Sequence, residues 1–273
     1  MIIYNKFLNL FFLIIFSFLP ISILVGSSVS LISVLLLSLY YVLTSLKKDF
    51  SYLLNEKTIL ILILLNFYLI FNSFISIDLS SGFFRNFGFV RYILLFLAIN
   101  YFVKVSNNLD KVFQFWTLIF LIVFFDIFYE FLNGQNILGF VSENKKRIVS
   151  FFKDEQVVGA FLNGFIFVII GFLFQKFEEK KNYEKFLIIL FIFLAILSMI
   201  VTGERSNTIK LFFGLAIFFY YNDKIKFKHK VIFVFSFIFS FLIIFNYFFS
   251  VSEQGHLKHR YYNDLVQRIT NKE

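Results

Sequence analysis

A repeated alternation of long apolar runs and short polar segments constrains the fold of this chain most strongly. Nine runs of about 15–20 mostly apolar residues follow one another, and the segments between them hold most of the charged side chains. A helix needs about 17–25 mostly apolar residues to cross a bilayer, where its backbone must satisfy its own hydrogen bonds. We therefore predict an all-α integral membrane protein, a polytopic bundle of about nine transmembrane helices. The predicted spans are residues 7–25, 29–46, 58–75, 87–103, 112–131, 157–174, 186–201, 207–221 and 231–249.

The composition excludes most soluble enzyme classes. Hydrophobic residues make up 59% of the 273 residues, more than the roughly 45–50% of an ordinary soluble domain. The chain has no cysteine and three histidines, and it carries no phosphate-binding loop, dinucleotide fingerprint or serine-hydrolase elbow. We expect no metal and no other cofactor. The net charge of +9 is expected to record membrane orientation rather than nucleic-acid binding.

Lysine placement predicts the orientation of the bundle. With a cytoplasmic N-terminus, every predicted inner segment carries lysine and none carries arginine, as the positive-inside rule favours. Nine spans then place the C-terminus outside the cytoplasm. We predict one polytopic membrane domain over residues 1–273, in which residues 250–273 form an outer tail.

The arginines are sorted to the opposite side. All six lie on or near the predicted outer face, where positive charge is disfavoured, which indicates that these positions require a guanidinium group. The planar guanidinium binds phosphate or carboxylate through two parallel hydrogen bonds and keeps its charge when partly desolvated. The residues are Arg85, Arg91, Arg147, Arg205, Arg260 and Arg268.

A charged turn, residues 202–208 (TGERSNT), separates two apolar runs. Charges at a membrane boundary indicate a functional site with a specific partner. The simpler alternative is that Glu204 and Arg205 cap two helices and solubilise the turn between them.

A second charged segment, residues 145–156, precedes the predicted span at 157–174. It contains Arg147, Lys153, Asp154 and Glu155. The two acids could cap the following helix and pair with Arg147. Alternatively, Arg147 and Arg205 converge at the outer leaflet on the pyrophosphate of a polyprenyl lipid, with Glu155 and Glu204 orienting them.

Asp126 and Glu130 lie four residues apart near the outer end of the predicted span at 112–131. Residues at this spacing share one face of a helix. Two interpretations remain open: the acids contact sugar hydroxyls in a hydrated cavity, or they lie at the membrane interface without a ligand.

These patterns resemble the O-antigen ligase and O-antigen polymerase superfamily of bacterial envelope glycosyltransferases. The distinctive segments are Arg147-x-x-Ser150-Phe151-Phe152-x-Asp154-Glu155-x-x-x-Gly159 and Thr202-Gly203-Glu204-Arg205-Ser206, and the Leu19-Pro20-Ile21 and Arg91-Tyr92 elements are also similar. The resemblance implies transfer of a saccharide from undecaprenyl pyrophosphate to a saccharide acceptor, such as lipid A-core or a growing glycan. It also implies a place among the lipids of the bacterial inner membrane, with the reaction at its outer face and with no metal.

The resemblance assigns expected roles to individual residues. We expect Arg205, Arg147 and Glu204 to be catalytic, and either His256 or His259 to be the base that activates the acceptor. The expected substrate-binding residues are Arg85, Arg91, Lys153, Asp154, Glu155 and Arg260.

Family members usually have further spans after a large outer loop. The resemblance therefore implies that residues 250–273 are the start of a large periplasmic loop, and we expect this chain to be an incomplete member. Two alternatives use the same arginines without chemistry. One is a transporter or flippase of lipid-linked glycan, although no internal repeat is visible and the charges gather at the edge rather than the midplane. The other is a non-catalytic membrane subunit that binds lipid-linked glycan.

Overall fold

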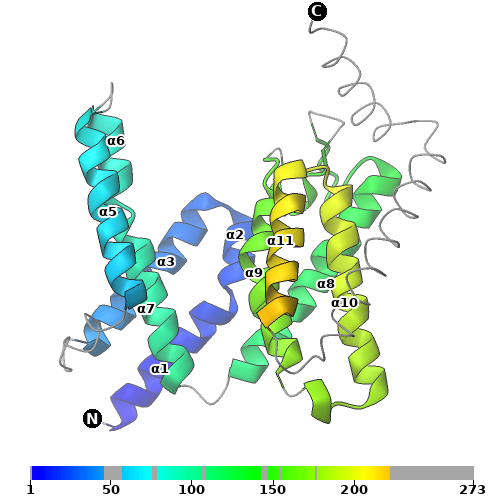
Figure 1. The fold of residues 1–273 in the computed structure, drawn as a ribbon, viewed down its shortest axis with the longest axis horizontal. Coiled ribbons are helices and arrows are strands. Elements are labelled where there is room, and N and C mark those ends of the chain that lie inside the picture. Colours follow the sequence, from blue (N-terminus) through cyan, green and yellow to red (C-terminus); the bar gives the residue numbers. More distant parts are fainter. Residues whose placement is uncertain are drawn as a thin grey trace, which may run out of the picture. The chain divides into compact units, whose positions relative to one another are not determined.

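The computed structural model describes residues 2–45, 57–75, 79–105, 109–142, 147–153, 155–175 and 177–221. Within these ranges the secondary structure is helical and contains no strand, which confirms the all-α class (Figure 1). The chain forms two compact units, Met1–Trp116 and Thr117–Glu273. The predicted span at 231–249 and the predicted tail at 250–273 lie outside the described residues.

The described residues of the first unit form six helices and the first turns of a seventh. In it α3 packs against α7, and α5 packs against α6. The elements are α1 (Ile2–Ser17), α2 (Leu19–Val25), α3 (Ser27–Ser45), α5 (Lys57–Ile75), α6 (Leu79–Phe87), α7 (Val90–Val105) and the start of α8 (Leu109–Asn133).

The first predicted span is divided at Phe18, two residues before the only proline of the chain. Pro20 lies in the first turn of α2, where its missing N–H removes no hydrogen bond. The indole nitrogen of Trp116 donates to the carbonyl of Ser17, the last residue of α1, at 3.0 Å. The ring of Trp116 also packs against Phe16, with centroids 4.9 Å apart. Pro20 therefore ends α1, and Trp116 satisfies a backbone group at the break.

The polar stretch between the predicted spans at 58–75 and 87–103 is helical over Leu79–Phe87. It packs against α5 through amide side chains. The side-chain nitrogen of Asn86 donates to the carbonyl of Leu69 and to the hydroxyl of Ser73, each at 2.8 Å, and Asn66 donates to the carbonyl of Asn86 at 3.1 Å. Interhelical hydrogen bonds of this kind are common in membrane bundles. The apolar segment that follows begins within α6, at Gly82.

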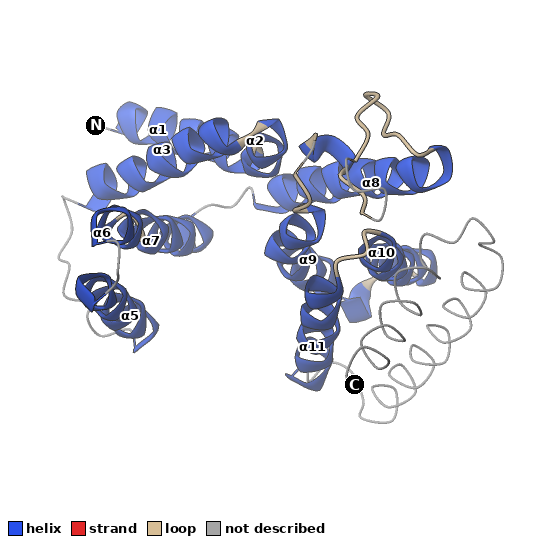
Figure 2. Ribbon diagram, turned by 90° about the horizontal axis from the view of Figure 1, so that it is seen from above, coloured by secondary structure: helices blue, strands red, loops and turns tan. Residues whose placement is uncertain are grey.

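In the second unit, the described residues form the rest of α8 and three further long helices, which run alternately in opposite directions (Figure 1). Helix α9 packs against α10 and α11 and lies between α8 and α11 (Figure 2). Phe120 of α8 stacks on Phe161 of α9 at 5.2 Å between ring centroids. The elements are η1 (Ser150–Phe152), α9 (Val158–Phe174), η2 (Phe177–Glu179), α10 (Asn182–Val201) and α11 (Arg205–Tyr221).

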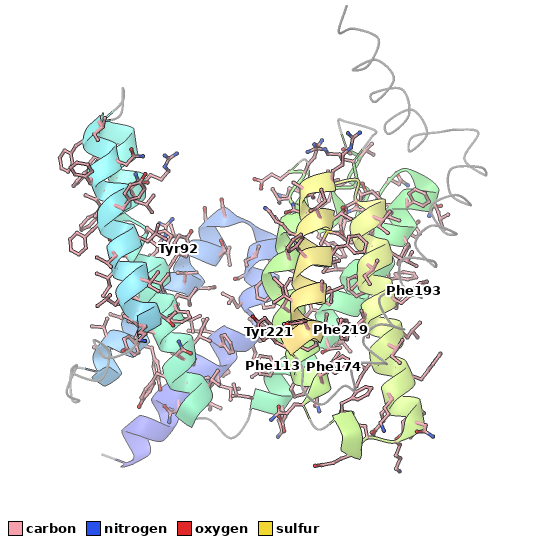
Figure 3. All side chains as sticks on the ribbon, viewed as in Figure 1. Tyr92, Phe113, Phe174, Phe193, Phe219 and Tyr221 are labelled. Carbon is pink, nitrogen blue, oxygen red and sulfur yellow. The ribbon has the colours of Figure 1, made fainter. Side chains whose placement is uncertain are left out.

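Close helix packing in this unit depends on a glycine. A Cβ atom at Gly214 of α11 would lie 2.2 Å from the ring of Phe167 on α9, so only glycine allows this approach without moving the ring. Aromatic rings pack at the C-terminal end of α9. There the ring centroids of Phe174 and Phe219 lie 5.9 Å apart, and both residues are labelled in Figure 3.

Among the residues that the structure describes, four segments are long and apolar enough to cross a membrane: Lys57–Ile75, Gly82–Val103, Leu109–Asn133 and Asn182–Val201. Ser27–Leu43 and Val158–Phe174 are shorter apolar helices. Large apolar side chains on α5 are exposed, including Phe67 at 66% and Ile75 at 70%, as expected for a surface that faces lipid rather than water. The chain therefore has the features of a helical membrane protein.

Candidate functional site

The candidate site lies at one end of the second unit, where α8 and α10 end and α9 and α11 begin (Figure 1). The turn at residues 202–208 connects α10 to α11 at this end. Residues 147–153, which we call the basic loop because they carry Arg147 and Lys153, lie between α8 and α9. Both predicted arginine segments therefore belong to the same end of one helical bundle.

Local hydrogen bonds build the turn between α10 and α11. The hydroxyl of Thr202 donates to the carbonyl of Met199 at 2.7 Å and accepts from the backbone N–H of Glu204 at 3.4 Å. Gly203 has φ of +71°, a left-handed conformation that glycine adopts without steric cost. The chain therefore reverses direction within three residues and begins α11 at Arg205.

Glu204 attaches this turn to the start of α9. Its side chain is 7% exposed. One carboxylate oxygen accepts from the backbone N–H of Gly159 at 2.7 Å, and the other accepts from the side-chain amide of Asn207. A carboxylate is favoured at the first turn of a helix, where backbone N–H groups lack intrahelical partners. A Cβ atom at Gly159 would lie 2.9 Å from this carboxylate, so the residue type at 159 permits the contact.

Asp126 and Glu130 of α8 attach the basic loop. They are 0% and 5% exposed, so neither lies at an open membrane interface or lines a cavity open to solvent. The two carboxylate oxygens of Glu130 accept from the backbone N–H groups of Val149 at 3.0 Å and Ser150 at 2.6 Å. Asp126 accepts from the hydroxyl of Ser150 at 2.5 Å and from the N–H of Ile137 at 2.9 Å. Four hydrogen bonds therefore hold polypeptide on both sides of the undescribed segment 143–146.

Asn136 completes this anchor. It is 1% exposed, and its side-chain nitrogen donates to the carbonyl of Ser150 at 2.6 Å. Its side-chain oxygen accepts from the N–H of Phe140 at 2.7 Å. Both backbone polar groups and the hydroxyl of Ser150 are thereby satisfied by buried side chains, which holds this residue at a φ of +49°, a conformation that serine rarely adopts.

The basic loop and the turn both contact the first residues of α9. Phe152 is 8% exposed and packs on Phe161, with ring centroids 5.4 Å apart. Gly159, two residues earlier in α9, binds Glu204. The segments that carry Arg147 and Arg205 therefore both contact one turn of α9, although the two arginines are 58 positions apart in the sequence.

The charged side chains at this end differ in burial and contacts. Arg147 and Arg205 are half-buried, whereas Lys153 and Glu155 are exposed. Arg147 has no hydrogen-bond or ion-pair partner among the residues that the structure describes. The predicted pairing of Arg147 with Glu155 is therefore not formed. Asp154 lies outside the described residues.

The buried carboxylates of Asp126, Glu130 and Glu204 all accept hydrogen bonds from uncharged donors. Hydrogen bonds to a charged group contribute about 1.5–3 kcal/mol each. These acids thus hold the backbone in place, and the geometry of Glu204 is that of a structural anchor. Its predicted catalytic role stays a prediction.

The other predicted site residues belong to the first unit or are not described. Arg85 and Arg91 belong to the first unit. Arg85 is exposed near the end of α6, and Arg91 lies over the ring of Tyr92, 4.9 Å from its centroid. The predicted residues Arg260, His256 and His259 lie outside the described residues.

The sequence did not reveal the partners of the buried acids. The spacing of Asp126 and Glu130 indicated a shared helix face, but no local pattern indicated that this face binds Ser150. Asn136 and Asn207 gave no signal, because single asparagines in loops and at helix ends are common. Within the described ranges, no group of three or more histidine, aspartate or glutamate side chains is placed to hold a metal ion.

No protein-family model matches the chain, and no curated protein or solved structure matches it. The functional argument therefore depends on the residues and contacts of the site itself.

Proposed function

We propose that this protein is an envelope glycan ligase or polymerase of the O-antigen ligase and polymerase type. It transfers a saccharide from undecaprenyl pyrophosphate to a saccharide acceptor at the outer face of the bacterial inner membrane. The observation that carries the proposal is the attachment of the Arg147 and Arg205 segments to the same turn of α9, through Phe152 and Glu204. Two guanidinium groups at one end of an apolar bundle suit a lipid whose head group is a pyrophosphate.

The position of Arg205 within its helix supports an anionic ligand. Arg205 is the first residue of α11, where the helix dipole already carries partial positive charge and disfavours a cation. An anion that binds the guanidinium and backbone N–H groups of the first turn offsets this cost. A bound pyrophosphate would thus counter the unfavourable interaction between the guanidinium and the helix dipole.

The proposed reaction needs no covalent enzyme intermediate. The acceptor hydroxyl attacks the anomeric carbon in line with the departing pyrophosphate, so a new glycosidic bond forms while the bond to the phosphate oxygen breaks. Arg147 and Arg205 stabilise the negative charge on the pyrophosphate. The hydroxyl proton passes to a base, for which His256 and His259 are the sequence-based candidates. The acceptor is lipid A-core or a growing glycan.

The proposal includes nine spans with a cytoplasmic N-terminus. The loop after α8 then lies outside and the loop after α9 lies inside. Alkaline phosphatase, which is active only outside the cytoplasm, is expected to be active when fused after Gly139 and inactive when fused after Lys180. These positions flank α9 (Val158–Phe174), so the pair measures the direction of one helix. The reverse pattern of activity would overturn the orientation and the outer location of both arginines.

Reconstitution tests the activity directly. The purified chain is placed in liposomes together with glycan-linked undecaprenyl pyrophosphate and a saccharide acceptor. Both substrates are extracted from the cells in which the protein naturally occurs. We expect release of undecaprenyl pyrophosphate that depends on the acceptor, together with a longer glycan on the acceptor. Binding of the lipid without release would instead support the transporter or non-catalytic alternative. If the chain neither binds the lipid nor releases it, the proposal is wrong.

A further inference from the structure

Glu130 and Asp126 hold the backbone from which Arg147 projects. Glu130 binds two consecutive N–H groups, those of Val149 and Ser150. Ser150 lies three residues after Arg147 and has a positive φ of 49°. A non-glycine residue keeps this conformation only when surrounding contacts compensate its cost. The direction of the basic loop thus depends on the buried acids of α8.

We propose that Glu130, assisted by Asp126, is a positioning residue that sets the basic loop against α9 and so places Arg147 for binding a pyrophosphate lipid. The placement of the loop rests on the observed hydrogen bonds. Its consequence for ligand binding rests on the proposed function. Neither acid touches the ligand, because both are nearly fully buried and their oxygens already accept hydrogen bonds.

The donors that each acid binds lead to different expectations for isosteric amide variants. Both partners of Glu130 are backbone N–H groups, which cannot accept a hydrogen bond. In Glu130→Gln the new NH₂ group must therefore face one of these donors. Asp126 binds one N–H and one hydroxyl, and a hydroxyl can also accept. In Asp126→Asn the hydroxyl of Ser150 can rotate and accept from the new NH₂ group, so both hydrogen bonds are retained.

Thiol labelling measures the placement of the loop without any activity assay. The chain contains no cysteine, so one introduced cysteine is the only reactive thiol. Val149 is 0% exposed and similar in size to cysteine, so Val149→Cys should react slowly with a maleimide. Adding Glu130→Gln should raise the labelling rate about tenfold, the effect expected for loss of one hydrogen bond to a charged group. Adding Asp126→Asn should change the rate less than about threefold, because its hydrogen bonds are retained.

Two controls separate loop release from general unfolding. Ala195 on α10 is 1% exposed. A cysteine at this position should therefore stay protected from the maleimide in the Glu130→Gln background if the bundle remains folded. Asp110→Asn removes an exposed acid from the first turn of α8, the helix that carries Glu130. This variant should leave the labelling of Val149→Cys unchanged.

Binding of undecaprenyl pyrophosphate by the full chain in detergent tests the consequence for the ligand. We expect Glu130→Gln to raise the dissociation constant about tenfold, again the loss of one such hydrogen bond, and Asp126→Asn and Asp110→Asn to leave it nearly unchanged. Unchanged labelling in Glu130→Gln, or equal effects of the two amide variants, would overturn the anchoring role. Faster labelling with unchanged affinity would overturn the role in binding. If the parental chain does not bind this lipid, the proposed function and the binding role both fail, and labelling alone decides the anchoring role.

Discussion

Replacing Arg205 by lysine is expected to lower the rate of glycan transfer by at least about a hundredfold, as removal of one preorganised charge-stabilising donor does in other enzymes. Lysine keeps the positive charge but offers a compact ammonium group instead of a planar fork with five N–H donors. Arg205 is half-buried at the start of α11, so the flexible lysine chain must place its charge there without the same set of hydrogen bonds. The measurement is acceptor-dependent release of undecaprenyl pyrophosphate from the reconstituted variant.

Lys210→Gln is the matched control for charge. Lys210 is exposed and lies five residues later on α11, so its replacement removes a full positive charge from the same helix. We expect its transfer rate to stay within about threefold of the parental rate, because exposed charges are strongly screened. Transfer at the parental rate by Arg205→Lys would contradict the assignment of a phosphate-binding role to Arg205.

Replacing Glu204 by alanine is expected to destabilise the second unit by about 3 kcal/mol, because a buried backbone N–H and a half-buried amide both lose their acceptor. The affected donors are Gly159 at the start of α9 and the side chain of Asn207 on α11. The free energy of unfolding is measured by titration with sodium dodecyl sulfate, and labelling of Ala195→Cys reports on the packing of the core. Glu155→Ala removes an exposed carboxylate just before α9. This variant should change the free energy of unfolding by less than about 0.5 kcal/mol.

Glu204→Gln separates the structural role of Glu204 from its predicted catalytic role. Glutamine keeps one oxygen to accept from Gly159, and the amide of Asn207 can turn its oxygen toward the new NH₂ group. We therefore expect a loss of stability of less than about 1 kcal/mol, since both hydrogen bonds can be kept. A normal transfer rate in this variant would show that Glu204 acts only as an anchor. A stable variant without transfer would support the catalytic role.

The positions of the helices were predictable because they depend on local properties of the chain. The predicted span at 157–174 agrees with α9 (Val158–Phe174) to within one residue, and the predicted span at 58–75 agrees with α5 (Lys57–Ile75) equally well. Apolar side chains must avoid water, and a helix satisfies its backbone within its own segment. Polar segments give a weaker signal, and for this reason the sequence does not predict α6 (Leu79–Phe87) as a helix of its own.

The sequence by itself determined the all-helical class and the apolar character of the segments. Only the tertiary structure decided which groups the buried acids bind. Glu204 meets Gly159 across 45 residues, and Glu130 meets Ser150 across 20 residues. Such partners are set by helix packing and by the need to satisfy every buried donor, and neither is encoded in local periodicity. Asp126, Glu130 and Glu204 thus anchor the segments that carry Arg147 and Arg205 through partners that the sequence did not indicate.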